Sequence, residues 1–397
     1  MASVYLIQYF VYRYLTFKNI EYTVTLSRNE VFEGEQLFLY EEISNNKLLP
    51  IPYAKIETEL PDGLSFLLMD NELASFDSVS SDKWKEFSSN SIQSIFSLGP
   101  KQKIRRRWRV VTSKRGNYYL GKAILVTSDI MCLNKFSRGF TMEPSKSNQL
   151  IVLPKAIDLS KVFSVSPLLN GDIITNASLV TDPMIFSGIR EYNISDPMKL
   201  INWKSSAVHS KLMVNTEEHT TSAKYSVILN MNSRESERSP LTPVSPGDVE
   251  KCITVCASLF DMASSNDIPM RFISNTLESF PEGKILPDGS VSENTIVTPF
   301  FKTKNDYISI LYLLARLDIR ISYSFEKLLA LISENPYPFS DNGSFIIATS
   351  YISREIIDFH EKMKQFNIST VFFVTTTNNG VINIPEDMDI RFENISK

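Results

Sequence analysis

The sequence has few of the residues from which zinc sites and disulfide frameworks are built. Its 397 residues include three cysteines and three histidines. No histidine has a cysteine or a carboxylate at metal-ligand spacing, so a zinc site is not expected. Cys252 and Cys256 lie four residues apart in an apolar stretch, where we expect them to pack as small hydrophobic side chains. Such sparse cysteine is typical of a reducing compartment.

Motifs of common enzyme classes are also missing. The sequence contains no GxxxxGK[ST] phosphate-binding loop and no GxSxG nucleophile elbow. A formal net charge of −4 provides no general attraction for nucleic acid. We therefore predict a non-enzymatic protein with no catalytic residues, no cofactor, no metal and no nucleic-acid partner.

Long hydrophobic runs are scarce, and the apolar stretch near the N-terminus is too short to span a membrane. Residues 3–17 (SVYLIQYFVYRYLTF) are apolar and aromatic but are interrupted by Arg13, whereas a membrane-spanning helix needs about 20 residues. Three interpretations are open: the end of a membrane helix, an interfacial segment, or a strand or helix packed on the protein. The tyrosines and nearby cations favour the membrane interpretations, because such side chains prefer the bilayer interface.

Residues 21–145 show the alternation of polar and apolar positions that is typical of antiparallel strands. Examples are EYTVTLS, YAKIETEL and KIRRRWRVV, separated by turn signals such as PDG and KRGN. We predict an antiparallel, immunoglobulin-like β-sandwich. Arg105, Arg107 and Arg109 share one face of a predicted strand. This face is solvated or in contact with anionic lipid headgroups, and nucleic acid is the third and most distant alternative.

From about residue 220 the pattern changes to strands that alternate with helices. Apolar strand-like runs occur at 224–231, 270–274, 343–350 and 369–376, and helical patterns at 248–265, 305–317, 324–334 and 353–367. This alternation predicts a doubly wound α/β domain with a mainly parallel sheet. Asp248 is the expected N-cap of the first helix. The loop 233–248 follows a central strand, at the end where open α/β sheets bind ligands.

The segment 188–207 (GIREYNISDPMKLINWKSSA) concentrates charged and aromatic side chains around one turn. Its first half alternates like a strand, and Asp196 and Pro197 predict the start of a helix. Leu200, Trp203 and Ala207 would share one face of that helix, which directs Trp203 toward a core.

The polar residues of this segment have three possible roles. Arg190, Glu191, Asp196 and Lys204 are suited to a structural brace, since charge networks more often organise structure than catalyse. An enzyme that uses this cluster is a second possibility. In the third, the segment binds a partner protein, because Arg, Tyr and Trp are enriched at interface hot spots. The candidate interaction residues are Arg190, Glu191, Tyr192, Asp196, Trp203 and Lys204.

This segment resembles the central motif of the bacterial domain of unknown function 58 family. The matching residues are Gly188, Arg190, Glu191, Tyr192, Asp196, Ile201, Trp203, Lys204, Ser206 and Ala207, and the departures are Ser195, Lys199 and Val208. The resemblance extends from about residue 20 to the end. It implies that residues 146–397 contain the connecting motif and a von Willebrand factor type A-like α/β domain.

The resemblance also implies a partner and a location. Genes of this family typically lie beside MoxR-type AAA+ ATPases, so we expect an adaptor that works with such an ATPase at the cytoplasmic face of the bacterial membrane. Members usually carry two membrane helices before the sandwich. Residues 1–20 resemble the tail of the second helix, a membrane-proximal remnant of a transmembrane segment.

Type A domains often bind a divalent cation after their first strand through an Asp-x-Ser-x-Ser motif. The corresponding residues here are Asn230, Asn232 and Arg234. Hard cations prefer carboxylate and hydroxyl oxygens, and a guanidinium repels them. We therefore expect a degenerate site that holds no metal; the alternative is a cation-dependent type A adhesion module.

Overall fold

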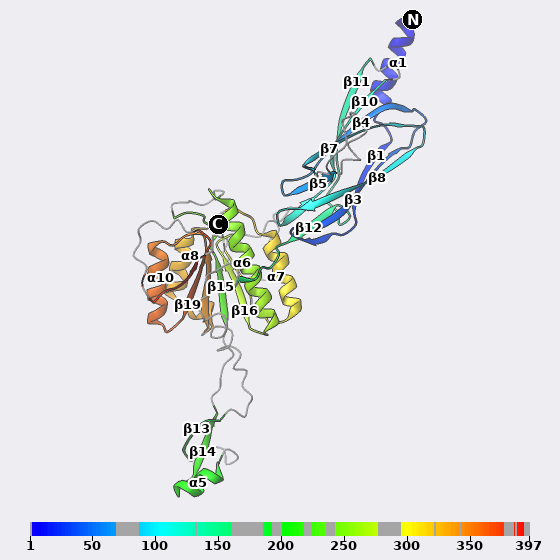
Figure 1. The fold of residues 1–397 in the computed structure, drawn as a ribbon. Coiled ribbons are helices and arrows are strands. Elements are labelled where there is room, and N and C mark those ends of the chain that lie inside the picture. The colour runs from blue at the N-terminus through cyan, green and yellow to red at the C-terminus, as the bar shows by residue number, and fades with distance from the viewer. Residues whose placement is uncertain are drawn as a thin grey trace, which may run out of the picture. The chain divides into compact units, whose positions relative to one another are not determined.

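A computed structural model describes most of the chain, and contacts between Cα atoms divide it into two compact units (Figure 1). Unit 1 comprises Met1–Lys155 and Leu311–Leu317, and unit 2 comprises Ala156–Ile310 and Asp318–Lys397. The described residues are 2–68, 87–129, 131, 133–159, 186–192, 201–217, 224–235, 243–276, 295–320, 323–341, 343–376, 385 and 387–392.

Unit 1 consists mainly of antiparallel sheets, as its alternating sequence predicts. Its strands are β1 (Ile20–Leu26), β2 (Glu30–Phe32), β3 (Gln36–Asn45), β4 (Ile51–Glu59), β5 (Leu64–Leu68), β6 (Phe87–Ser89), β7 (Ser91–Leu98), β8 (Lys103–Thr112), β9 (Gly116–Tyr119), β10 (Lys122–Ser128), β11 (Lys135–Thr141) and β12 (Gln149–Leu153). They form a five-stranded sheet β1-β3-β8-β5-β6, a four-stranded sheet β11-β10-β4-β7 and a three-stranded sheet β2-β12-β9. One apolar core joins side chains from all three sheets, such as Leu39, Ile56 and Val152. The arrangement is that of a β-sandwich.

The N-terminal segment forms helix α1 (Ala2–Leu15). Tyr12 is buried and donates a hydrogen bond to the backbone oxygen of Pro50 at 3.2 Å, so the helix packs on unit 1. The rings of Phe10 and Tyr14 are exposed and stack with their centroids 6.3 Å apart. Within the described residues, no helix combines the length and apolarity that crossing a membrane requires.

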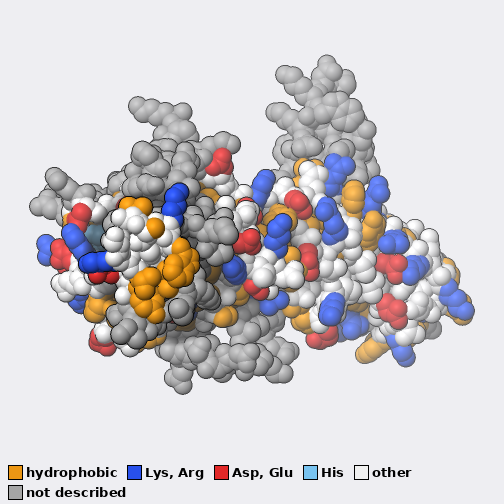
Figure 2. Space-filling view, turned by 90° about the horizontal axis from the view of Figure 1, so that it is seen from below, with side chains coloured by type: hydrophobic (Ala, Val, Ile, Leu, Met, Phe, Trp, Pro, Cys, Tyr) orange, Lys and Arg blue, Asp and Glu red, His pale blue; other side chains and the backbone are white. Residues whose placement is uncertain are grey.

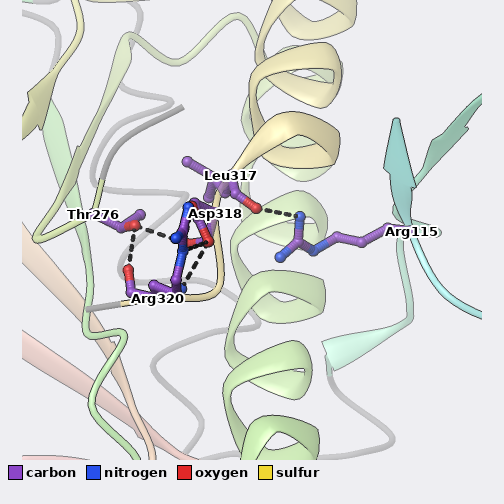
Figure 3. A network of polar contacts seen from close by, with 5 residues as sticks. All are labelled: Arg115, Thr276, Leu317, Asp318 and Arg320. Carbon is purple, nitrogen blue, oxygen red and sulfur yellow. Dashed lines mark hydrogen bonds and ion pairs between the residues drawn. The ribbon is translucent and has the colours of Figure 1, made fainter. Parts of the chain in front are cut away.

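Residues 311–317, the end of helix α7 (Lys304–Arg316) and the residue after it, belong to unit 1. Arg115 is buried and donates through Nη1 to the backbone oxygens of Leu314 at 2.6 Å and Leu317 at 3.3 Å. Figure 3 shows the contact with Leu317. A cation is favourable there, because the last carbonyls of a helix lack intrahelical partners and carry partial negative charge.

Unit 2 contains the parallel sheet that the alternating strands and helices predict. Its strands are β15 (Tyr225–Leu229), β16 (Met270–Ser274), β17 (Ile296–Val297), β18 (Ser344–Thr349), β19 (Thr370–Val374) and β20 (Asp389–Phe392). They lie in the order β17-β16-β15-β18-β19-β20, and all neighbours are parallel except β16 and β17. Every residue of β15 is buried, as expected for the central strand of a sheet covered on both faces.

Helices cover both faces of this sheet (Figure 1). Helices α8 (Phe325–Glu334) and α10 (Arg354–Gln365) contribute Leu328, Ile332, Ile356 and Phe359 to a core cluster that also holds Ile228 of β15. Helix α6 (Pro246–Ser265) lies on the opposite face. The short helix α9 (Tyr337–Ser340) precedes β18.

Some predicted details of unit 2 were wrong or incomplete. Helix α6 begins at Pro246 with Ser245 as its N-cap, so Asp248 lies in the first turn and is not the cap. The fixed φ of proline suits the first helical position, which moves the start toward the N-terminus. The short elements β17, α9 and β20 were not predicted. The four residues of β20 include Asp389 and Arg391, which break an apolar strand pattern.

A ribbon and a short helix precede the parallel sheet in sequence. Strands β13 (Phe186–Glu191) and β14 (Met213–Glu217) form where strands were predicted, and the two pair antiparallel. Between them lies α5 (Trp203–His209), whose N-cap Asn202 accepts a hydrogen bond from the backbone of Ser205 at 3.0 Å. The helix start predicted at Asp196 and Pro197 lies outside the described residues.

Candidate functional site

Buried polar side chains gather at the carboxyl edge of the unit 2 sheet. Asn230 follows β15, Asn275 follows β16, Thr349 ends β18 and Thr375 follows β19. Parallel strands bring these positions to one edge of the sheet, and each of the four side chains is at least 95% buried, Thr375 being the most exposed at 5%. Ligands bind at this edge in open α/β folds.

Three asparagines form a hydrogen-bond network at this edge. The Nδ2 atom of Asn230 donates to Oγ1 of Thr349 at 3.0 Å, and its Oδ1 accepts from the backbone of Asn232 at 2.9 Å. Asn275 donates through Nδ2 to Oδ1 of Asn232 at 2.9 Å and accepts from the backbone of Met231 at 2.9 Å. The network joins the turn after β15 to the strands on either side of it.

The donor set of this edge does not fit a divalent cation. The oxygens of Asn230, Asn232 and Asn275 are neutral, and each already accepts an N–H hydrogen bond. Arg234, the third position of the expected motif, is exposed. Among the described residues, no three His, Cys, Asp or Glu side chains are grouped so that they could hold a metal ion. Hard cations favour anionic oxygen ligands, which these positions do not provide.

The polar edge continues toward α6. The Sγ atom of Cys252 lies 3.6 Å from Oγ of Ser350 and 3.5 Å from Oγ1 of Thr375, which donates to the backbone oxygen of Asp248 at 3.3 Å. Burial, together with the neighbouring Cys252, raises the pKa of the Cys256 thiol. Both cysteines are buried, as predicted, and the protonated thiol of Cys256 is a poor nucleophile.

Thr276 extends the edge beyond β16. Its hydroxyl hydrogen-bonds the backbone oxygens of Asp318 at 2.7 Å and Arg320 at 2.9 Å (Figure 3). Arg320 donates through Nε to the Asp318 carboxylate at 2.9 Å, and this hydrogen bonding raises the pKa of Arg320. The contacts hold the segment 318–320 against the end of β16.

The polar residues predicted in segment 188–207 lie mostly at the surface. Glu191 forms an ion pair with Lys211 at 2.7 Å, in which about two thirds of each side chain is exposed. This hydrogen bond raises the pKa of Lys211. Tyr192 is half-buried and its backbone donates to Leu212 at 2.8 Å, while Lys204 is exposed.

Two of the predicted interaction residues are described only in part or not at all. The backbone of Arg190 lies in β13 and pairs with that of Val214 in β14. Asp196 lies outside the described residues. The expected brace of Arg190, Glu191, Asp196 and Lys204 therefore stays a prediction.

Trp203 is exposed, and its predicted packing into a core was wrong. Its exposed fraction is 66%, whereas that of Ile201, just before the helix, is 7%. Helix α5 starts only after Asn202, so Trp203 is its first residue, and the inward position falls to Ile201. Val208 is 75% exposed and Leu212 46% exposed.

We call Trp203, Lys204, Ala207, Val208 and Leu212 the α5 surface; all five are exposed. Figure 2, seen from the side on which α5 lies in Figure 1, shows hydrophobic side chains gathered in this region.

Sequence reasoning missed Asn275 and Thr276, which have no motif of their own. A usable signal was present, because both follow directly after the apolar strand MRFIS, at the end where parallel strands present polar groups. Their partners in the network could not be assigned without the order of the strands.

Comparison with known proteins gives only distant structural likeness. No protein-family model matches the sequence, and a search of curated proteins finds no match. The CARDB domain of PF1109 from Pyrococcus furiosus, solved in complex with di-metal ions, is 12% identical with a TM-score of 0.19, over 35% of this chain and 98% of that domain.

Two further structures are similarly distant. The sporulation control protein Spo0M from Bacillus subtilis is 11% identical with a TM-score of 0.19, over 44% of this chain and 58% of Spo0M. The full-length major pilin SpaD from Corynebacterium diphtheriae is 9% identical with a TM-score of 0.21, over 30% of this chain and 34% of SpaD. The matches thus span less than two thirds of Spo0M and SpaD, and at these TM-scores all three carry no inference about activity.

Proposed function

We propose that this chain is a non-enzymatic interaction protein that binds a partner protein through its α5 surface. The exposed indole of Trp203 carries the proposal, because a tryptophan that is 66% exposed leaves a large apolar side chain in water, and Val208 and Leu212 of the same segment are exposed as well. Tryptophan is among the residues that contribute most to binding at protein interfaces.

The backbone around the α5 surface is held in place before any partner binds. Asn202 donates from its backbone to Met213 of β14 at 2.8 Å. The hydroxyl of Ser206 donates to the backbone oxygen of Asn202 and accepts from the backbone of Met213, both at 2.8 Å. A preorganised surface loses less conformational entropy on binding, which favours affinity.

The proposal includes the family and the partner. The match of segment 188–207 to the domain of unknown function 58 motif supports a von Willebrand type A-like identity for the α/β region, and a MoxR-type AAA+ ATPase as the partner. The proposed location is the cytoplasmic face of a bacterial membrane. Because the asparagine network does not fit a divalent cation, the proposed contact uses protein groups without a bridging metal ion.

The test is binding of the full chain to a purified MoxR-type ATPase from the same organism, measured by calorimetry. Trp203→Ala should weaken binding by about 2 kcal/mol, or roughly 30-fold, as expected for an interface hot spot. Arg190→Ala tests the neighbouring strand of the same segment. Leu331→Ala, which truncates another exposed apolar side chain of unit 2, is the matched control and should bind normally.

Unchanged affinity in a folded Trp203→Ala protein would contradict the proposal and indicate that segment 188–207 has a structural role. Loss of affinity in Leu331→Ala as well would also contradict the proposal, because it would show that general surface hydrophobicity drives the interaction.

A further inference from the structure

A row of arginines on β8 forms a second surface, in unit 1. Arg105, Arg107 and Arg109 occupy alternate positions and therefore share the outer face of the strand. The first two are exposed and Arg109 is half-buried. Alternate residues of a strand lie about 7 Å apart, so the row is about 13 Å long. We call these three residues the β8 arginine row.

Aromatic rings of β3 hold two of these arginines in place. The guanidinium of Arg105 lies 4.6 Å from the ring centroid of Tyr40, and that of Arg107 lies 4.9 Å from the ring centroid of Phe38. Tyr40 pairs in register with Arg107, so each arginine reaches the ring diagonally across from it. Stacking of this kind stabilises the guanidinium and leaves the N–H donors at its rim available to an anion.

Among the described residues, no ion pair joins Arg105, Arg107 or Arg109 to a carboxylate. Glu42 of β3 lies opposite Arg105 in register, but its ion pair is with Lys103, at 2.5 Å. Three adjacent unpaired cations repel one another, and this repulsion is relieved when a surface with several negative charges binds.

The position of the row favours one kind of anion. Strand β8 lies inside its sheet, between β3 and β5, so it offers no free backbone edge to an added peptide strand. Single-stranded nucleic acid binds by stacking bases on open aromatic faces. Here arginines lie over the rings of Tyr40 and Phe38. An extended surface of phosphate groups can bind arginines without a free strand edge or an open aromatic face.

We infer that the β8 arginine row is a docking site for anionic phospholipid headgroups. Arginine pairs with phosphate through two parallel N–H groups. The β8 arginine row is extended, and so is the layer of phosphate groups at a bilayer surface. Helix α1 of the same unit exposes Phe10, Arg13 and Tyr14, residue types that favour the bilayer interface. The inference deepens the proposed membrane location, but it concerns another unit and needs no partner protein, so vesicle binding tests it separately from binding to the ATPase.

Co-sedimentation of the full chain with vesicles tests the inference. Vesicles of phosphatidylcholine with 40% phosphatidylglycerol should bind the protein, with affinity that falls steeply as salt increases, and pure phosphatidylcholine vesicles should bind it weakly. The triple variant Arg105→Gln, Arg107→Gln, Arg109→Gln should weaken binding to anionic vesicles by about 100-fold, since each cation contributes roughly fivefold.

A second triple variant is the matched control. Lys55→Gln, Lys122→Gln and Lys135→Gln remove the same charge from β4, β10 and β11 of the other sheet. This variant should keep most of its vesicle binding. Equal losses in both variants would overturn the inference, because net charge alone would explain them. Should the arginine triple variant not fold, Arg107→Gln alone should weaken binding by about fivefold.

Two further probes separate lipid from other sources of phosphate. Inorganic phosphate at 10 mM should leave vesicle binding nearly unchanged, since one small anion cannot engage the whole row. A single-stranded oligonucleotide, followed by fluorescence anisotropy, should bind more weakly than the anionic vesicles. Tighter oligonucleotide binding that is lost in the arginine variant would replace the lipid assignment with nucleic acid.

Discussion

The side-chain amide of Asn275 donates a hydrogen bond to Oδ1 of Asn232 across 2.9 Å, joining the ends of two adjacent parallel strands. Both residues are buried, and both are neutral. At the edge of the sheet where ligands usually bind, this chain therefore has a network of neutral amides that hydrogen-bond one another, the hydroxyl of Thr349 and the backbone oxygen of Tyr323. Such a network stabilises the turns after the strands and provides no charge for an incoming cation.

Removing Asn275 should destabilise unit 2 strongly. Asn275→Ala leaves the Met231 amide without its acceptor and takes a donor from the Asn232 oxygen, so the free energy of unfolding should fall by about 2 to 3 kcal/mol. Asn335→Ala, at an exposed position after α8, should change it by less than about 0.5 kcal/mol. Urea unfolding measures both. Equal effects would show that the buried network adds little to stability.

Glu41 and Glu42, neighbours in β3, should respond very differently to substitution. Glu41 is buried and accepts hydrogen bonds from Tyr22 at 3.1 Å, Thr58 at 2.5 Å and Trp108 at 3.2 Å. Glu41→Ala leaves these donors without an acceptor, and the free energy of unfolding should fall by about 3 kcal/mol or more.

Glu42 serves as the matched control for that experiment. It faces outward and pairs with Lys103, so Glu42→Ala should cost no more than about 0.5 kcal/mol. Chemical denaturation followed by tryptophan fluorescence compares the two variants. A Glu41→Ala protein as stable as Glu42→Ala would contradict the role of the buried carboxylate as a shared acceptor.

Lys47 should make the stability of unit 1 depend on pH in the alkaline range. Burial lowers the pKa of Lys47 from 10.5 to about 8, although its ammonium donates to the backbone oxygens of Thr16 and Lys18. Between these two pKa values the unfolded chain binds more protons than the folded chain, so this group makes stability rise as pH increases from about 8 to 10.5.

The Lys47→Met variant isolates this contribution. Stability measured at several pH values should increase more steeply for the wild type than for Lys47→Met across that interval, because other titrating groups are common to both proteins. Parallel curves would show that the ammonium is better solvated than its burial indicates. Titration of Lys47 by NMR provides a direct check on its pKa.

Elements with a strong local pattern were predicted closely. The strand predicted at 270–274 is β16, and the helix predicted at 305–317 is α7, shifted by one residue. Burial on both faces makes a central strand continuously apolar, and a helix buried on one side repeats its apolar residues at helical spacing. Such periodicities are present in the sequence before any tertiary contact forms.

The errors and omissions arose where a local pattern was weak or where distant residues decided the outcome. Strand β20 contains the buried Arg391, which pairs with Asp389 at 2.9 Å. These charged residues break the apolar pattern by which a short strand is predicted. Trp203 was assigned to a core because a longer helix was expected; the observed start after Asn202 changed which residue faces inward. Neither outcome can be read from spacing alone.

The sequence by itself determined the two kinds of architecture, because the periods of its apolar residues differ before and after the middle of the chain. Only the tertiary structure decided which polar groups meet. Asn230 and Asn232 lie in one turn, whereas Asn275 and Thr349 come from segments far away in the chain, and the order of strands in the sheet brings them within hydrogen-bond distance. Hydrogen bonds act over about 3 Å, so their partners depend on the assembled fold.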